Sequence, residues 1–145
     1  MNIREVIFRI EHERKEQNAI YHSAAAKFGL TDTALWVLYC ISEPLEDQTQ
    51  QDLCRRGCYA KQTINTAIIG LASDGMVELI PIPGTRNHKK IHLTQKGREL
   101  VNRTARKLKA AEENAYARLS EEELATYLEI AAKLNEYLRE ETDKL

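Results

Sequence analysis

The chain has 145 residues and a formal net charge of −1, with 43% hydrophobic and 30% charged residues. This length suits one folded domain with a single core, and the composition excludes a disordered chain. No apolar run approaches the roughly 18 residues that a membrane helix needs, and the first residues lack the basic-then-apolar pattern of a signal peptide. We therefore expect a cytoplasmic protein without a membrane segment.

Charge is distributed unevenly along the chain. Residues 49–94 carry six Lys and Arg against three Asp and Glu, and residues 95–109 carry six against one. Residues 1–48 carry five against eight, and residues 110–145 carry four against ten. A basic middle between acidic ends places any site for a polyanion in the middle of the chain.

The first part of the chain has the periodicity of helices. An apolar stripe that is interrupted by polar residues and then resumes predicts a long helix over residues 3–28. Thr31 or Asp32 can cap a second helix over residues 33–42. Apolar side chains cover most faces of this second helix, which indicates deep burial, and Pro44 ends it.

Two shorter helices follow in the basic middle. Thr49 caps a helix over residues 50–56, which a glycine stops. Residues 60–73 then repeat apolar side chains at spacings of 0, +3, +4 and +7, which is typical of a helix with one buried face. These apolar positions are Ile64, Ala67, Ile68 and Leu71.

The pattern then changes to that of a hairpin. Residues 77–82 are rich in β-branched side chains and predict a strand, and residues 91–93 alternate like a return strand. Between them, the turn carries the basic stretch of residues 86–90. A helix over residues 94–118 and a last helix that begins with the Ser120 capping box complete a predicted order of α-α-α-α-β-β-α-α.

Two short helices followed by a basic hairpin indicate a mainly α, winged helix-turn-helix fold. An α-helix fits the major groove of DNA, where base edges display a distinguishable pattern of donors and acceptors. The helix over residues 60–73 has polar residues opposite its apolar stripe, and these are the predicted groove-facing contacts: Lys61, Gln62, Thr63, Asn65 and Thr66. The hairpin side chains predicted to lie near phosphates or the minor groove are Arg86, His88, Lys89 and Lys90. Thr49 and Gln50 either cap their helix or hold a phosphate at its N-terminus.

With these elements in place, the sequence resembles the MarR (multiple antibiotic resistance regulator) family of transcriptional regulators. Four segments in the right order and spacing carry the resemblance, namely residues 49–53, 61–65, 71 with 74–78, and 93–97. The resemblance implies a DNA-reading helix, a wing that contacts DNA through Arg86, and a dimer built from the first and last helices. Ala60 departs from the serine N-cap that is usual in the family, and the wing keeps only one of its arginines.

The terminal helices are the predicted dimerisation region, over residues 1–28 and 110–145, and residues 30–109 are the predicted winged helix domain. The apolar stripes of these terminal helices are larger than the core of one small protomer can cover. The residues predicted to form the dimer interface are Ile3, Ile7, Leu124, Leu128, Leu134 and Leu138. The sequence thus predicts a homodimer that binds double-stranded DNA at a pseudopalindromic operator, as a repressor.

In the MarR family, small aromatic effectors often bind where the dimerisation helices meet the winged domain. The side chains that can line such a cavity here are Tyr21, His22, Phe28, Trp36 and Tyr39. A thiol-based redox switch through Cys54 and Cys58 is an alternative, because nearby basic residues and a helix N-terminus lower a thiol pKa. Another alternative is a winged helix module that binds protein rather than DNA.

The sequence contains no residue pattern that is typical of a catalytic or metal site. No nucleophile–base pair, phosphate loop or pair of acidic residues is recognisable. The four histidines, His12, His22, His88 and His92, lack a compact metal-ligand spacing. We therefore expect neither enzymatic activity nor a metal or other cofactor.

Overall fold

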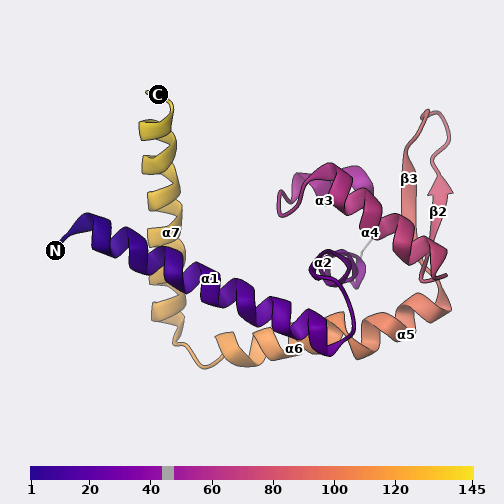
Figure 1. Ribbon diagram of the computed structural model, residues 1–145, viewed down its shortest axis with the longest axis horizontal. Coiled ribbons are helices and arrows are strands. Elements are labelled where there is room, and N and C mark those ends of the chain that lie inside the picture. Colours follow the sequence, from indigo (N-terminus) through magenta and orange to yellow (C-terminus); the bar gives the residue numbers. More distant parts are fainter. Residues whose placement is uncertain (44–47) are drawn as a thin grey trace. The chain divides into compact units, whose positions relative to one another are not determined.

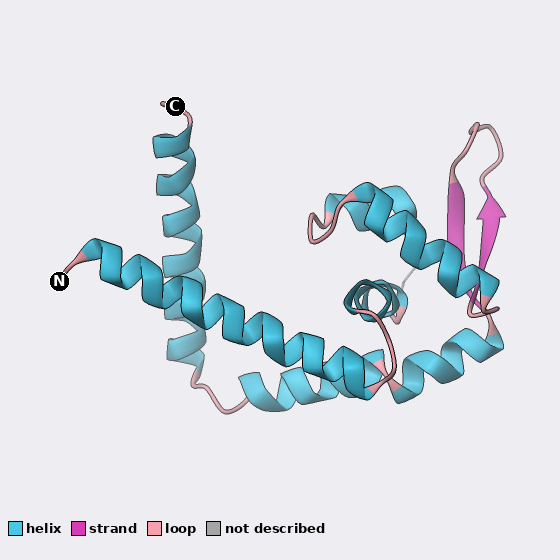
Figure 2. Cartoon of the chain, in the orientation of Figure 1, coloured by secondary structure: helices cyan, strands magenta, loops and turns pink. Residues whose placement is uncertain are grey.

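The computed structural model describes residues 1–43 and 48–145. Figure 1 traces the helices and strands, and Figure 2 shows that helices dominate the described chain. The prediction that Pro44 ends the second helix lies outside the described residues. In chain order the elements are α1 (Ile3–Lys27), α2 (Asp32–Ile41), β1 (Gln48–Thr49), α3 (Gln50–Arg55), α4 (Lys61–Ser73), β2 (Val77–Pro81), β3 (Lys89–Leu93), α5 (Gln95–Arg103), α6 (Ala105–Tyr116) and α7 (Glu121–Thr142).

The chain divides into two compact units, residues 1–109 and residues 110–145. The first unit holds α1 to α5, the sheet and the start of α6. The second unit holds the rest of α6 and all of α7. Within the described residues, no helix is both long enough and apolar enough to cross a lipid bilayer.

The first unit has one apolar core to which each of its helices and both long strands contribute. The helix α2 lies at its centre, as its apolar composition predicts, and α4 buries Ile64, Ile68 and Leu71 at no more than 5% exposure. These residues lie at i, i+4 and i+7, the spacing that places side chains on one face of a helix. The other buried apolar residues are Ala25, Leu35, Val37, Leu38, Cys40, Ile41, Leu53, Val77, Ile91, Leu100, Val101 and Ala105.

The three strands form one antiparallel sheet in the order β1-β3-β2. The hairpin pairs Val77 with Leu93 and Pro81 with Lys89. On the other edge of β3, Gln48 and Thr49 of β1 pair with Ile91 and Lys90. This last pairing ties the start of α3 directly to the hairpin.

The predicted element order is wrong in two places. The strand β1 is absent from the predicted order, because a strand of two residues has no periodicity and forms only by pairing with distant β3. The helix predicted over residues 94–118 is two helices, α5 and α6, which break at Thr104. The Thr104 hydroxyl donates a hydrogen bond of 2.7 Å to the Leu100 carbonyl oxygen, and such back-bonding by threonine bends helices.

The capping residues predicted from the sequence occupy their positions. The side-chain oxygen of Thr31 accepts from the Ala34 amide at the start of α2, and that of Thr94 accepts from the Gly97 amide at the start of α5. Full capping boxes begin α3 at Thr49 and α7 at Ser120. These caps satisfy amides that would otherwise be unpaired at helix N-termini.

The second unit has no core of its own. None of residues 110–145, all of which the structure describes, is buried. The side chains of α7 that the sequence predicts for a dimer are 67% exposed at Leu128, 37% at Leu134 and 49% at Leu138. Leu124 is partly buried. On α1, in the first unit, Ile3 is 62% and Ile7 is 51% exposed.

Candidate nucleic-acid interface

The helix α4 has one buried apolar face and one exposed polar face. Five of its exposed residues are those predicted to face the groove, namely Lys61, Gln62, Thr63, Asn65 and Thr66. The N-cap, Ala60, makes no side-chain hydrogen bond, so the first amides of α4 receive no side-chain cap. The five residues are thus exposed on one helix, and their contact with DNA stays a prediction.

The Thr66 side chain turns back toward its own helix. Its hydroxyl donates a 3.0 Å hydrogen bond to the carbonyl oxygen of Gln62, one turn earlier. All the residues predicted for this face are polar, but the exposed surface of α4 also includes Ile69, which is 55% exposed. The helical spacing could have identified Ile69, because it falls outside the stripe of Ile64, Ile68 and Leu71.

The N-terminus of α3 is occupied by a side chain of the protein itself. The Asp52 carboxylate accepts hydrogen bonds from the Thr49 amide at 2.8 Å and the Thr49 hydroxyl at 2.9 Å. These bonds, together with the positive charge of Arg55, hold the Asp52 pKa below its ordinary value despite some desolvation. Thr49 therefore acts as a capping residue, and Gln50 beside it is partly buried.

The wing is the β2–β3 hairpin and its loop. The Ile82 amide donates to the His88 carbonyl oxygen at 2.9 Å, and the Thr85 hydroxyl donates to the Ile82 carbonyl oxygen at 2.8 Å. Gly84 has a φ of +78°, which a residue with a side chain rarely adopts. This turn presents Arg86 and His88 as exposed loop residues.

Lys89 and Lys90 lie in β3 rather than in the turn, so the predicted extent of the charged tip is wrong. The return strand begins at Lys89, two residues earlier than predicted, because its pairing with Pro81 extends the ladder. Both lysines are exposed. Since neighbouring strand residues point to opposite faces of a sheet, a ligand bound to one face can contact only one of these two lysines.

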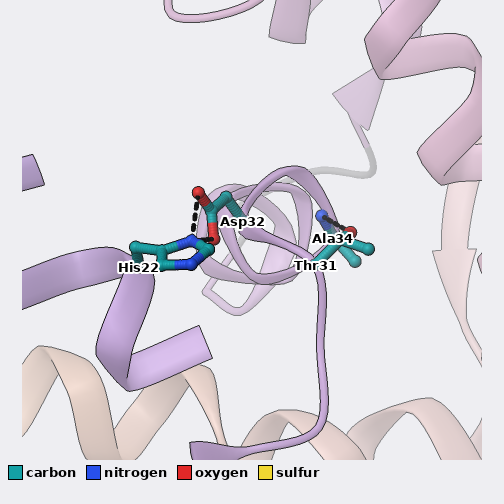
Figure 3. A network of polar contacts seen from close by, with 4 residues as sticks. All are labelled: His22, Thr31, Asp32 and Ala34. Atoms are coloured by element: carbon teal, nitrogen blue, oxygen red, sulfur yellow. Dashed lines mark hydrogen bonds and ion pairs between the residues drawn. The ribbon is translucent and has the colours of Figure 1, made fainter. Parts of the chain in front are cut away.

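Three of the five residues predicted to line an effector cavity, His22, Trp36 and Tyr39, fall into two groups. In the first, the His22 Nδ1 atom of α1 lies 2.8 Å from an Asp32 carboxylate oxygen of α2 (Figure 3). The Trp36 ring packs edge-on against Tyr59, with ring centres 5.4 Å apart. Burial and the negative charge of Asp32 raise the Tyr59 pKa. Asp32 begins α2 and Tyr59 lies between α3 and α4, and neither is among the residues predicted from the sequence. No local sequence signal places Tyr59 beside Trp36, because the two residues are far apart along the chain.

In the second group, Tyr39 faces α6 instead. The Lys109 ammonium lies 4.7 Å from the centre of the Tyr39 ring, and the same atom is 3.6 Å from a Glu43 carboxylate oxygen. A cation over an aromatic face is an attractive arrangement. The remaining two predicted residues, Tyr21 and Phe28, are partly buried on and just after α1.

A separate hollow of about 410 Å³ lies where the end of α2, the strand β3 and the helices α5 and α6 meet. Arg98 and Arg106 line it, and the Arg98 guanidinium donates to the Leu93 carbonyl oxygen at 2.8 Å. None of the five residues predicted for the effector lines this hollow. The other lining residues are Ile41, Ser42, Glu43, Ile91, His92, Leu93, Val101 and Asn102.

The three cysteines are free thiols in different surroundings: Cys40 is buried, Cys54 is partly buried and Cys58 is exposed. The Cys58 Sγ atom lies 3.8 Å from the Arg56 carbonyl oxygen. Burial raises the Cys40 pKa, and the Arg56 side chain, hydrogen-bonded to the thiol, offsets part of this. The alternative of a thiol-based redox switch through Cys54 and Cys58 stays a prediction.

Solved structures resemble this fold, although neither a protein-family model nor a curated protein matches the sequence. A MarR family regulator from Neisseria meningitidis has a TM-score of 0.81 at 15% identity, and the match covers 99% of each chain. A putative MarR family regulator from Listeria monocytogenes, complexed with 26mer DNA, has a TM-score of 0.71 at 18% identity, over 93% of this chain and 89% of that one. NadR in complex with 4-hydroxyphenylacetate has a TM-score of 0.68 at 15% identity, over 89% of this chain and 91% of that one.

The match extends over nearly the whole length of each chain and includes the terminal helices as well as the winged segment. The fold that the sequence resemblance implies is therefore confirmed. The chain has the winged helix fold of the MarR family of transcriptional regulators.

Proposed function

We propose that this protein is a sequence-specific regulator of transcription that binds double-stranded DNA as a homodimer. The observation that carries the proposal is the exposed polar face of α4, with Lys61, Gln62 and Asn65, opposite a fully buried apolar face. The DNA complex of the Listeria monocytogenes structure, which has the same fold, supports it. The exposed polar side chains of α4, together with the basic residues of the wing, also favour DNA over the alternative of a protein-binding module.

In this proposal α4 enters the major groove. Gln62 and Asn65 have the amide groups that bond adenine in a bidentate manner, and Lys61 reaches guanine or a phosphate. Arg86 and His88 on the wing loop contact the adjacent backbone or minor groove. Phosphate contacts fix the position of the protein on the duplex, whereas the α4 contacts select the sequence.

The homodimer part of the proposal is supported by the exposed apolar side chains of α7 and α1. Large apolar side chains are exposed repeatedly along each of these helices, which is typical of interaction sites, and most soluble homo-oligomers are two-fold symmetric. A second copy of the chain presents the same apolar helices and can cover them. Two-fold symmetry then implies a pseudopalindromic operator, with half-sites about one helical turn apart, and occupancy of a promoter by such a dimer represses transcription.

Control by a small aromatic effector is the finer part of the proposal. The His22–Asp32 pair lies at the junction of α1 and α2, where α1 joins the winged domain, and Trp36 of α2 contacts Tyr59 between α3 and α4. NadR, which has the same fold, binds 4-hydroxyphenylacetate. An aromatic acid that binds this junction in only one conformation shifts the population away from the DNA-binding form.

The test begins with in vitro selection of duplexes by the full-length protein, followed by footprinting of the recovered sequence. Gln62→Ala and Asn65→Ala should each relax base preference at particular positions by about 1–3 kcal/mol. Asn102→Ala, an exposed amide on α5, is the matched control and should leave the preference unchanged. Failure to recover any preferred duplex, or equal behaviour of all three variants, contradicts the proposal.

A further inference from the structure

Four exposed side chains form a ridge along two turns of α4: Gln62, Asn65, Thr66 and Ile69. Their spacing of 0, +3, +4 and +7 is the spacing with which the reading helix of a homeodomain presents base-contacting residues to the major groove. Three members are polar, as a base-reading surface requires. The fourth, Ile69, is a large apolar side chain that is 55% exposed.

The exposure of Ile69 contrasts with the other large apolar residues of the same helix. Ile64 is 0%, Ile68 is 2% and Leu71 is 5% exposed, because they form the face that packs on the core. Ile69 follows Ile68 directly and so lies about 100° further round the helix, away from that face. Ile69 therefore buries much less apolar surface in the core than these three residues do. Its side chain places an apolar group on the polar side of α4.

Thr66 adds a second apolar group beside it. Its hydroxyl donates to the Gln62 carbonyl oxygen at 3.0 Å, so the hydroxyl proton is already used within the helix. Its hydroxyl oxygen can still accept a hydrogen bond, and its methyl is the group that Thr66 can offer for apolar contact. Residues three apart on a helix are neighbours, about 5–6 Å apart at Cβ, so the Thr66 methyl and the Ile69 side chain form one small apolar patch on the ridge.

The major groove contains one apolar group that can match this patch, the C5-methyl of thymine. In the same groove, adenine offers the N6 and N7 atoms that glutamine and asparagine recognise. An A·T pair therefore carries, side by side, partners for both the amide and the apolar members of the ridge. A mixed ridge of two amides and two apolar groups fits A·T pairs better than G·C pairs, whose groove edge has no methyl group.

We propose that Ile69, together with the Thr66 methyl, recognises thymine methyl groups, so that each half-site contains A·T pairs read jointly with Gln62 and Asn65. This inference rests on the proposed DNA binding. It assigns to Ile69 a role in specificity, through apolar contact with the base edge. The contact replaces water on both apolar surfaces and is worth about a fourfold change in affinity per methyl group.

The experiment uses the full-length protein and the duplex recovered by in vitro selection, with thymines replaced one at a time by deoxyuridine. This replacement removes only the C5-methyl and keeps every hydrogen-bonding group. The wild-type protein should lose about fourfold in affinity at one or two positions of each half-site. Ile69→Ala should bind the thymine duplex more weakly and should no longer distinguish deoxyuridine from thymine at one of those positions.

Matched variants separate the methyl effect from general damage. The Thr66→Val variant keeps a methyl group and should still distinguish thymine from deoxyuridine. The Thr66→Ser variant keeps only the hydroxyl group and should lose this discrimination at the base that Thr66 contacts. Leu119→Ala removes another exposed large apolar side chain, 46% exposed between α6 and α7, and should discriminate as the wild type does. Circular dichroism should show an unchanged helix content for Ile69→Ala, since its side chain lies outside the core.

The proposal is wrong if deoxyuridine has no effect at any position, or if Ile69→Ala and the wild type lose the same factor at every position. It is also wrong if Ile69→Ala changes the sedimentation of the protein and leaves discrimination intact, because Ile69 then covers a protein contact. If no duplex is recovered by selection at all, the proposed DNA binding itself fails, which is a different result from binding without methyl discrimination.

Discussion

Gly97 packs so closely against Met76 that a Cβ atom at position 97 would overlap the Met76 carbonyl oxygen. The first turn of α5 is fixed there by Thr94, whose hydroxyl lies 2.6 Å from the Gly75 carbonyl oxygen. Gly97→Ala should therefore force the wing and α5 apart and lower the free energy of unfolding by about 1–3 kcal/mol or more. Urea unfolding followed by circular dichroism measures this loss.

Gly70 is the matched control for this prediction. It lies inside α4, and a Cβ atom there would meet nothing within 4 Å. Gly70→Ala should raise the free energy of unfolding by about 0.5–1 kcal/mol, because alanine is the better helix former and has less freedom in the unfolded chain. The same sign of change for both glycines would contradict the packing of α5 on Met76.

Arg86 on the wing loop should contribute charge rather than sequence preference. Arg86→Ala should weaken binding to all duplexes and reduce the slope of log affinity against log salt by about one. Fluorescence anisotropy at several salt concentrations gives this slope. Arg139→Ala, which removes an exposed arginine of α7, should leave the slope unchanged. An unchanged slope for Arg86→Ala would place the wing away from the phosphates.

The sequence predicts most of the helices and the hairpin because each has a local signal. Apolar spacing identifies α4, and side-chain caps mark the starts of α2, α3, α5 and α7. The strand β1 has no such signal, since Gln48 and Thr49 become a strand only when β3 lies beside them. The break at Thr104 is also not evident, because a single threonine is compatible with a continuous helix until its hydroxyl bonds the Leu100 carbonyl oxygen.

In the candidate interface, too, features with a local sequence signal are predictable and features that depend on distant contacts are not. The polar residues of α4 are predictable, since their exposure follows from the helical period. The exposure of Ile69 was missed because an isoleucine beside Ile68 resembles core in composition, and only its angular position separates the two. The partners of the aromatic residues, Tyr59 for Trp36 and Lys109 for Tyr39, come from other helices and have no local sequence signal.

The apolar face of α7 should determine the oligomeric state. Replacing Leu128 and Leu134 by glutamate puts charges where the proposed dimer buries apolar surface, and it should give monomers by sedimentation. The monomer should lose the tight binding to a duplex with two half-sites. Glu136→Ala, elsewhere on the exposed surface of α7, is the control and should remain dimeric. A double glutamate variant that sediments as a dimer would place the interface elsewhere.

Acid should weaken the start of α3 through Asp52. Its pKa is held below the ordinary value chiefly by the Thr49 amide, so the ionised carboxylate stabilises the folded state. This stabilisation is fully present above the pKa of the unfolded chain, about 3.9, and is lost as the pH falls through the lower pKa of the folded state. Asp52→Asn should therefore lower the free energy of unfolding near neutral pH and flatten its dependence on pH in the acid range. Urea titrations from neutral pH to about pH 2 test this, and a variant with the wild-type acid slope would contradict it.

Trp36 is the only tryptophan of the chain, and its ring contacts Tyr59 at the junction where we propose that an effector binds. A small aromatic acid that enters this junction should change the emission of Trp36 and release DNA, because it favours one of two conformations. A coupling free energy of about 1–3 kcal/mol corresponds to a release of several-fold to about a hundredfold. The experiment titrates 4-hydroxyphenylacetate and salicylate while Trp36 emission and DNA anisotropy are followed together.

Tyr59→Phe keeps the ring contact and should keep the response, whereas Tyr59→Ala should reduce the potency of the acid. Release of DNA without any change in Trp36 emission would place the effector site elsewhere, and release by peroxide that Cys58→Ser abolishes would support the thiol switch instead.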